Sequence, residues 1–441
     1  MPIVSPAPLA SLSPALFAAA TGRLHSLFQP DIDTAAPMLA AAIGGKRVLV
    51  IGGAGSIGSA VTVELADLKP AALHVIDQSE NGLAELVRHL RSRPAGLEVA
   101  DFQTLPLDYG APVTEMFLRA QAPYDAIFNF AALKHVRSEK DVFSLLQMLD
   151  TNLCKQVRFM GWLRDLGYAS RYFCVSTDKA ANPVSLMGSS KRLMEHVLFS
   201  EQAVPGLQAV ITSARFANVA FSDGSLLQSF LNRLAKRQPL AAPRHTKRYF
   251  VSFQEAAQIC LLAALTAPGH SIVVPKLDPS KDLVDLQAVA ERVLRHFGFE
   301  PAYYDDETAA RHAVAAEMTQ GRYPLLLTPL DTGGEKPYEE FVGLGEEAFE
   351  IGLQPCGPCP ICRRRRTAWD GCWRWCRPRC VVSAASSKAN WSQRSRASSR
   401  ISPMPIAGTT SISGCKAGGC PARMIGTMVR HGRNKSGHDG L

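Results

Sequence analysis

The fold is decided by residues 47–58, which read RVLVIGGAGSIG. The apolar residues Val48 to Ile51 are typical of a buried strand, and apolar residues at helical spacing come after the glycines. Glycines between a strand and a helix allow a tight turn and bring backbone amides close to a pyrophosphate at the positive end of the helix. A glycine turn without a ligand is the alternative, but strand, turn and helix occur here in the required order. We therefore expect cofactor contacts from Gly52, Gly55, Ser56, Ile57 and Gly58.

A second strand is expected at residues 73–76, and it ends in Asp77, 19 residues after Gly58. A carboxylate at this place suits the ribose hydroxyls of an adenosine. It favours NAD over NADP, although Ser79 leaves room for a phosphate. The expected cofactor is therefore NAD(P), with NAD preferred.

Further strands, each followed by a helical segment, are expected at residues 102–107 and 126–130. Repeated alternation of strand and helix predicts the α/β class, with a doubly wound parallel sheet of the Rossmann type and right-handed crossovers. Asp108 ends one strand, and the small residues Ala131 and Ala132 follow the other. We expect these three residues to contact the cofactor.

The predicted chemistry lies in residues 171–192. An apolar run at 172–175 indicates a buried strand, and a helix is expected to begin near Leu186. Between them lies a cluster of hydroxyl, carboxylate and ammonium groups, made of Ser176, Thr177, Asp178 and Lys179. Ligands bind beyond the carboxyl ends of parallel strands, so this cluster is expected to line a pocket with Met187 and Lys191, which share one helical face. A solvated turn before an ordinary surface helix is the alternative.

Candidate substrate contacts come from two further places. Lys134 follows the strand at 126–130, and the neighbouring His135 is interpreted as structural. Arg248 lies in a short strand expected at 247–251, where a guanidinium suits a diphosphate. An equally compatible interpretation is that Lys247 and Arg248 form a basic pair on a solvated face.

The alternation of strands and helices loosens after a strand at 209–212. Helical patterns at 226–234, 253–265 and 283–297 predict a smaller mixed α/β cap that binds substrate over the crevice. Weak helical patterning around 16–27 predicts an arm packed on the domain that comes after it. The expected division is an arm, a Rossmann domain, a cap and a tail, at residues 1–45, 46–220, 221–353 and 354–441.

The tail differs from the rest of the chain in composition. It carries eight of the 11 cysteines and four of the five tryptophans. Zinc ligands are an alternative interpretation of six of these cysteines, but their spacing fits no regular finger, so we expect no metal. The six are Cys356, Cys359, Cys362, Cys372, Cys376 and Cys380. An excess of Arg, Ser, Cys, Trp and Pro without apolar periodicity is what a GC-rich gene gives when read out of frame. We therefore interpret the tail as disordered or non-native.

Charge divides in the same way. The formal net charge of +9 separates into +14 on residues 354–441 and −5 on residues 1–353, so a nucleic-acid partner could depend only on the tail and is not expected. No apolar run is long enough to span a membrane, and the first residues lack a basic leader, so we expect a cytoplasmic protein without a membrane partner. The three cysteines before the tail are scattered and form no disulfide framework.

Together these motifs resemble the extended short-chain dehydrogenase/reductases, and more narrowly the nucleotide-sugar 4,6-dehydratases of the CapD-like polysaccharide-biosynthesis family. The resemblance rests on residues 52–58, 131–136, 176–183, 187–192, 215–219 and 248–250. Residues 131–141 and 331–336 are most similar to the soluble branch linked to legionaminic-type sugars, and the resemblance stops near Leu353. One departure is Met187, which stands where the superfamily has the Tyr of a Tyr-x-x-x-Lys pair, as in some CapD-like members. Its thioether has no proton to exchange.

The resemblance implies conversion of UDP- or GDP-N-acetylglucosamine to a 4-keto-6-deoxy sugar, with hydride taken from carbon 4 and returned to carbon 6. Lys191 would hold the nicotinamide ribose, and Ser176 or Thr177 would bind the carbon 4 oxygen. Asp178 would be the acid for the 6-hydroxyl and Lys179 the base at carbon 5. Diphosphate contacts would come from Arg215, Asn218 and Arg248, with Lys134 also at the substrate.

We also expect a homo-oligomer, and two other functions stay open. A nucleotide-sugar 4-epimerase shares the fold but does not need the Asp178–Lys179 pair. A catalytically silent dinucleotide-binding protein is suggested by Met187.

Overall fold

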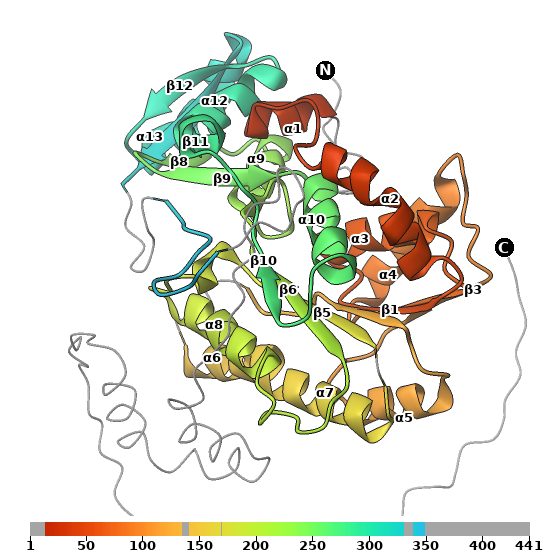
Figure 1. Ribbon diagram of the computed structural model, residues 1–441. Helices are drawn as coiled ribbons and strands as arrows, with labels where there is room; N and C mark the ends of the chain where they lie inside the picture. The colour runs from red at the N-terminus through yellow and green to blue at the C-terminus, as the bar shows by residue number, and fades with distance from the viewer. Residues whose placement is uncertain (1–13, 135–140, 169, 330–337, 349–441) are drawn as a thin grey trace, which may run out of the picture. The chain divides into compact units, whose positions relative to one another are not determined.

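The computed structural model describes residues 14–134, 141–168, 170–329 and 338–348. At its centre lies a seven-stranded sheet in the order β10-β6-β5-β4-β1-β2-β3, in which all neighbouring strands are parallel (Figure 1). Its strands are β1 (Arg47–Ile51), β2 (Ala72–Ile76), β3 (Asp101–Leu105), β4 (Ala126–Asn129), β5 (Arg171–Val175), β6 (Val210–Ala214) and β10 (Ser271–Val273). The predicted α/β class with a doubly wound parallel sheet is confirmed.

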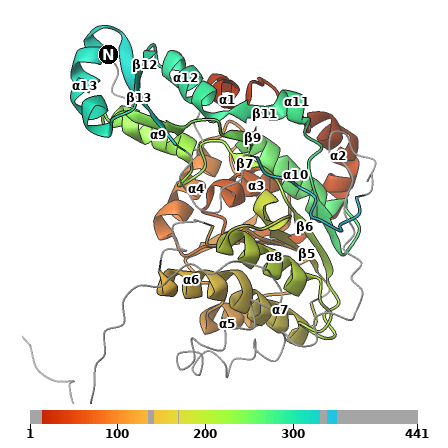
Figure 2. The same ribbon diagram turned by 90° about the vertical axis from the view of Figure 1, so that its left-hand side faces the viewer.

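Helices cover both faces of this sheet because alternate strand residues point to opposite sides. Val48 and Val50 face one layer, made of α2 (Gln29–Ile43), α3 (Ser56–Asp67), α4 (Glu80–Ser92) and α10 (Phe253–Leu265). Leu49 and Ile51 face the other, which contains α5 (Pro112–Ala120), α7 (Lys155–Asp165) and α8 (Leu186–Leu198). Figure 2 shows the two layers on opposite sides of the sheet. Between β4 and α7 the chain forms α6 (Val142–Leu149) and the π-helical turn η3 (Asp150–Cys154).

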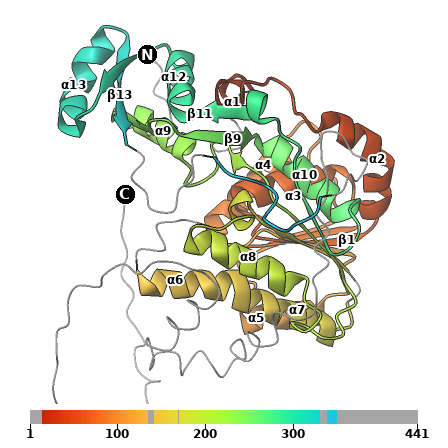
Figure 3. The same cartoon turned by 60° about the vertical axis from the view of Figure 1, so that its left-hand side comes forward.

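A smaller set of elements, which includes α9 (Leu226–Ala235), α12 (Leu286–His296) and α13 (Glu307–Thr319), lies together at the upper left of Figure 3. It has its own buried cluster, which includes Phe230, Val293 and Leu325. Three parallel strands, β12 (Glu300–Tyr304), β13 (Arg322–Thr328) and β8 (Leu240–Pro243), pack with α9, α12 and α13. A second three-stranded sheet joins β11 (Leu283–Asp285), β9 (Lys247–Val251) and β7 (Asn218–Val219), with the short α11 (Pro279–Asp282) before β11. We call these elements the cap.

The sequence ranges do not map one-to-one onto these layers. Residues 253–273, inside the range expected for the cap, form α10 and the edge strand β10 of the large sheet. The helix expected from Leu283 begins at Leu286, because residues 283–285 pair with β9. The N-terminal arm also divides: α1 (Pro14–Thr21) packs into the cap cluster, whereas α2 packs on the large sheet.

Predictions on His135, on residues 331–336 and on the tail from 354 lie outside the described residues. They stay predictions. Within the described part, no helix combines the length and apolar character that crossing a membrane requires.

Candidate functional site

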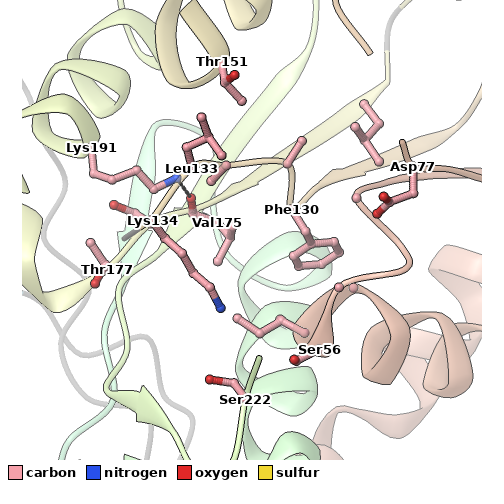
Figure 4. Close-up of a pocket in the computed structure, with 18 of the residues that line it drawn as sticks. Ser56, Asp77, Phe130, Leu133, Lys134, Thr151, Val175, Thr177, Lys191 and Ser222 are labelled. Carbon is pink, nitrogen blue, oxygen red and sulfur yellow. Dashed lines mark hydrogen bonds between the residues drawn. The ribbon is translucent and has the colours of Figure 1, made fainter. Parts of the chain in front are cut away.

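A cavity of about 910 Å³ opens at the carboxyl ends of β1, β4 and β5. Its lining joins the glycine-rich turn after β1 to the Ser176–Lys179 cluster after β5, and it also includes Met187 and Lys191 of α8. Figure 4 shows Ser56 and Asp77 on one side of this cavity and Thr177 and Lys191 on the other. Segments far apart in the sequence therefore share one site, as parallel strands require.

The glycine-rich turn has the shape that a dinucleotide phosphate needs. Gly52 has a φ of +76°, and a Cβ there would lie 2.7 Å from the Ala131 nitrogen. A Cβ on Gly58 would lie 2.2 Å from the Gly52 oxygen, so this glycine permits close packing. Gly55 differs, because a Cβ there would meet only the Gly52 oxygen, at 3.5 Å. A side chain at Gly55 would instead extend into space that a ligand can occupy, beside the first turn of α3, whose N–H groups have no helical partner.

Asp77 is held at the end of β2 by two backbone donors, Ala54 N–H at 3.0 Å and Ser79 N–H at 2.8 Å. It lines the cavity, as the ribose-binding prediction requires. The Ser79 hydroxyl accepts from Gly82 N–H at 3.2 Å and caps α4. This use of the hydroxyl competes with the phosphate contact considered for Ser79.

Asp108 also lines the cavity, but it carries a partner that the sequence did not reveal. Lys155 of α7, nearly buried, places its Nζ 2.5 Å from Asp108 Oδ2. Burial raises the pKa of Asp108, but hydrogen bonds from Lys155 and Gly110 outweigh it, and the pKa falls below its usual value. No local pattern identifies Lys155, since its partner is 47 residues away.

Lys191 and Met187 lie on the same face of α8 and both line the cavity. Lys191 Nζ donates to the Val175 carbonyl at 2.8 Å (Figure 4). Burial lowers the pKa of Lys191, an effect that Cys174 and Glu195 partly offset. The Met187 side chain is buried, so a thioether occupies the position expected to correspond to the Tyr of the superfamily's Tyr-x-x-x-Lys pair.

Ala131, Ala132 and Lys134 follow β4 along the cavity wall. Figure 4 shows the Lys134 ammonium pointing into the cavity. Although the residue is exposed, the protein around its ammonium displaces water and lowers the pKa of Lys134, and the charge of Asp223 opposes this.

Asp178 and Lys179 form an ion pair at the cavity, with Lys179 Nζ 3.2 Å from Asp178 Oδ1. Thr177 Oγ1 donates to the same carboxylate oxygen at 2.7 Å, and Asp178 is almost fully buried. A second carboxylate, Glu339, lies 3.7 Å from Lys179 Nζ. The candidate acid and base are therefore in direct contact, and two carboxylates lie within 3.7 Å of the Lys179 ammonium.

The Ser176 hydroxyl is already hydrogen-bonded to a buried side chain. Its Oγ donates to Glu195 Oε1 at 2.6 Å. The proton of Ser176 thus points to a buried carboxylate, and that of Thr177 points to Asp178.

The structure does not bring Arg215 or Arg248 into the cavity lining, although Asn218 is there. Arg215 is fully buried and makes bidentate contacts with Glu195 and Glu346. Burial lowers the pKa of Arg215, but the two carboxylates raise it above its ordinary value. Arg248 Nη1 donates to the Lys247 carbonyl at 2.8 Å. The expectation that Arg215 holds a diphosphate is therefore wrong for this arrangement, because its guanidinium is committed to carboxylates.

Several lining residues were not anticipated. The π-helical turn η3 brings Thr151 to the cavity, and the Tyr109 hydroxyl donates to the Thr151 carbonyl. A π-turn has no clear sequence signal, since it differs from an α-helix by one hydrogen-bond step. Other examples are Gln78, Phe130, Leu133, Gln147, Asp150, Lys155, Phe216, Ala217 and Ser222.

A Rossmann sheet, a glycine-rich turn and a lysine on the helix after β5, all meeting at one cavity, define an extended short-chain dehydrogenase/reductase. The chain belongs to the CapD-like polysaccharide biosynthesis protein family, whose model matches residues 48–347.

Known proteins agree with this assignment. The "uncharacterized membrane protein MJ1061" of Methanocaldococcus jannaschii is 31% identical over 310 residues, which are 69% of this chain and 83% of that protein. A UDP-N-acetylglucosamine 4,6-dehydratase (inverting) of Campylobacter jejuni is 25% identical over 57% of this chain and 73% of the enzyme. The solved structure of Pen from Bacillus thuringiensis has a TM-score of 0.57 at 22% identity, covering 70% of this chain and 86% of Pen, and supports the fold.

Other relatives restrict the conclusions that similarity supports. UDP-glucose 4-epimerases of Rickettsia are among the matches, at lower identity. Two longer relatives are polysaccharide-biosynthesis proteins, and the match to this chain covers only 50% and 39% of their length. Similarity therefore shows the family and leaves the reaction to be argued from the site.

Proposed function

We propose that the protein is a nucleotide-sugar 4,6-dehydratase that converts UDP- or GDP-N-acetylglucosamine to a 4-keto-6-deoxy sugar. The observation that carries the proposal is the Asp178–Lys179 pair, which lines the same cavity as the glycine-rich turn and Lys191. An epimerase needs only reversible oxidation at carbon 4. Loss of water also needs one group to give a proton and one to take a proton, which such a pair supplies.

NAD(P), with NAD favoured, is the proposed cofactor. The turn from Gly52 to Gly58 would hold its pyrophosphate, Asp77 its adenosine ribose and Lys191 its nicotinamide ribose. When bound, the nicotinamide would supply reversible oxidation of the sugar. Open space at Gly55 and the two backbone donors that orient Asp77 support this fit.

Lys191 and Lys134 would bind the charged and polar parts of the substrate. Lys191 donates hydrogen bonds to the Val175 carbonyl and to the Met194 sulfur, and its ammonium has a third N–H that can donate to the carbon 4 oxygen. Lys134 would reach the diphosphate with Asn218, which also lines the cavity. The chain offers no phenol at Met187, so the proton of the carbon 4 hydroxyl would leave through Lys191, Thr177 or water.

Asp178 and Lys179 would manage the two proton transfers of dehydration. As an ion pair they hold one transferable proton between them, at a contact of 3.2 Å. Passing it from Lys179 to Asp178 would leave the neutral carboxylic acid and the neutral amine that the two proton transfers need. Asp178 would then protonate the departing 6-hydroxyl while Lys179 takes the proton from carbon 5.

Product analysis tests the proposal. The protein, supplied with NAD⁺ and either UDP-N-acetylglucosamine or GDP-N-acetylglucosamine, should form a 4-keto-6-deoxy sugar that NMR detects. An epimer would instead support the second function. No conversion of either substrate would leave a dinucleotide-binding protein.

Asp178→Asn should abolish dehydration, on the order of a 100-fold or larger loss of kcat, because general acid catalysis contributes at that scale. NAD⁺ binding should persist in this variant, since Asp178 is assigned no cofactor contact. Asp165→Asn is the matched control, because Asp165 is a half-exposed carboxylate at the end of α7 that pairs with Arg164. Full activity of Asp178→Asn would remove Asp178 from the acid role.

A further inference from the structure

Residues 338–348, which we call the strap, return to the site after β13 and lie against residues 176–183, which we call the Ser176 loop. Figure 1 shows the strap as a blue segment near α8. Gly343 marks the closest approach, because a Cβ there would lie 2.4 Å from the Ala181 carbonyl oxygen. The strap and the loop thus pack backbone to backbone.

Side chains tie the strap to the far end of the Ser176 loop. Asn182 Nδ2 donates to Glu340 Oε2 at 2.7 Å, and Asn182 Oδ1 accepts from Leu344 N–H at 2.8 Å. Glu339, which is buried, lies 3.7 Å from Lys179 Nζ. One asparagine and one lysine of the loop therefore each have a partner in the strap.

A buried chain of charges ties the strap to the near end of the loop. Glu346 receives two hydrogen bonds from Arg215, at 2.6 and 2.8 Å. On its other side Arg215 donates twice to Glu195, at 2.7 Å each. Glu195 then accepts from Ser176 Oγ at 2.6 Å. The strap thus reaches the first residue of the loop through two intervening side chains.

This arrangement couples docking of the strap to the geometry of the loop. Arg215 is fully buried, and its guanidinium keeps all four of its hydrogen bonds to carboxylates only while both Glu195 and Glu346 are in place. Arg192 adds a second cation beside Glu346 and Glu195, which makes the group neutral overall. Removing one member of a buried ion group leaves an uncompensated charge, and that is strongly unfavourable. If Glu346 moved away, Glu195 would be the remaining carboxylate partner of Arg215. We expect Glu195 to change position, and with it the hydrogen bond that it accepts from Ser176.

We infer that the strap is the positioning element of the Ser176 loop, with Glu346 and Glu339 as its positioning residues. Glu346 fixes Ser176 through Arg215 and Glu195, and Glu339 fixes the ammonium of Lys179. The expected effect of the strap on turnover rests on the proposed function. The expected effect of the strap on the geometry of the Ser176 loop is independent of that function.

The test measures amide hydrogen exchange across residues 176–183 together with kcat, KM and NAD⁺ affinity. In Glu346→Gln and Glu339→Gln we expect exchange in the loop to be about tenfold faster, because local opening sets the rate. kcat should fall on the order of 100-fold, since small misplacements of reacting groups have effects of that size. NAD⁺ affinity should stay within about twofold. Glu347→Gln is the matched control, because it makes the same change at the adjacent, exposed strap residue.

If Glu346→Gln does not fold, a variant combining Asn182→Ala and Glu339→Gln replaces it. Those changes release the loop without stranding Arg215. Loop exchange and kcat equal to those of Glu347→Gln would overturn the inference. A third outcome is possible, in which the variants show faster loop exchange but the wild type converts neither sugar. That outcome would support the positioning role of the strap and contradict the proposed function.

Discussion

Asp178 and Lys179 are already paired in the structure, and the same is true of most polar side chains around the cavity. Thr177 donates to Asp178, and Lys191 donates to the Val175 carbonyl. Preorganised partners hold reactive groups in place before substrate arrives and lower the cost of reaching the reactive geometry. The glycines of the turn contribute through the absence of a side chain, which leaves space for a ligand or for a close backbone contact.

Gly55 and Gly58 allow these two uses of glycine to be separated. Gly55→Ala should fold with nearly unchanged stability, because its Cβ would meet only one protein atom, at 3.5 Å. It should weaken NAD⁺ binding about tenfold or more, since the methyl group would occupy the space that we propose for the phosphates. The check is the increase in melting temperature that NAD⁺ causes in each protein.

Gly58→Ala provides the contrast, because its Cβ would lie 2.2 Å from the Gly52 oxygen. We expect this variant to lose about 1–3 kcal/mol of stability even without NAD⁺, as overpacked interiors do. Equal effects of the two substitutions on stability would contradict the assignment of Gly55 to the cofactor.

At the scale of elements, helices and loops bring side chains to the cavity from several directions. The turn η3 and α7 contribute Thr151 and Lys155, and α8 contributes Met187 and Lys191. The strap contacts the site indirectly, because its Glu346 reaches Ser176 through Arg215 and Glu195. These elements meet only because β1, β4 and β5 are adjacent in one sheet.

Docking of the strap should depend on pH through Glu346. Burial raises the pKa of Glu346, but Arg215, the Gly343 N–H and Arg192 lower it from 4.5 to about 2. The folded pKa lies below the unfolded pKa, so this carboxylate stabilises the fold fully above about pH 4.5 and loses that contribution as pH falls toward about 2.

Melting temperatures of the wild type and Glu346→Gln between pH 3 and pH 7 measure this contribution. We expect the variant to be less stable near pH 6 and the gap to narrow as the solution becomes acidic, because glutamine does not titrate. A gap that stays constant down to about pH 3 would show that the charge of Glu346 is not what holds the strap.

At the scale of the whole molecule, the N-terminal helices link the two sets of elements that form the site. Leu16 and Ala20 of α1 belong to the cap cluster, and Ala35 and Leu39 of α2 belong to the cluster on the large sheet. Ser56 adds a direct link, since its hydroxyl accepts from the Asp223 N–H at 2.9 Å. The cavity wall therefore depends on residues from the first helix to the strap.

Residues after Leu353 should be dispensable for this assembly. The three buried clusters of the described structure draw on residues 16 to 327, and the strap ends at 348. A chain ending at Leu353 should melt within about 2 °C of the full chain, because it loses no buried contact of the described core. Thermal unfolding of both chains checks this, with product formation as a second readout. A large fall in melting temperature would assign the tail a structural role.

Local patterns in the sequence were sufficient for most of the large sheet and for one side of the site, but they did not predict its edge strand β10. Apolar runs fix the strands β1, β2, β4 and β5, and the glycines after β1 fix the turn, because both depend on neighbouring residues. The four-residue spacing of Met187 and Lys191 places them on one helical face. Asp178 and Lys179 come directly after a buried strand, so their position at the cavity was predictable.

Only the tertiary structure decided which side chains pair across the molecule. Arg215 looks like a ligand contact in sequence, yet its partner Glu346 is 131 residues away, and together with Glu195 it commits the guanidinium to the interior. The contacts of Lys155 with Asp108 and of Glu339 with Lys179 are equally non-local. A buried charge must find its counter-charge wherever the fold places one, and no local periodicity records that choice.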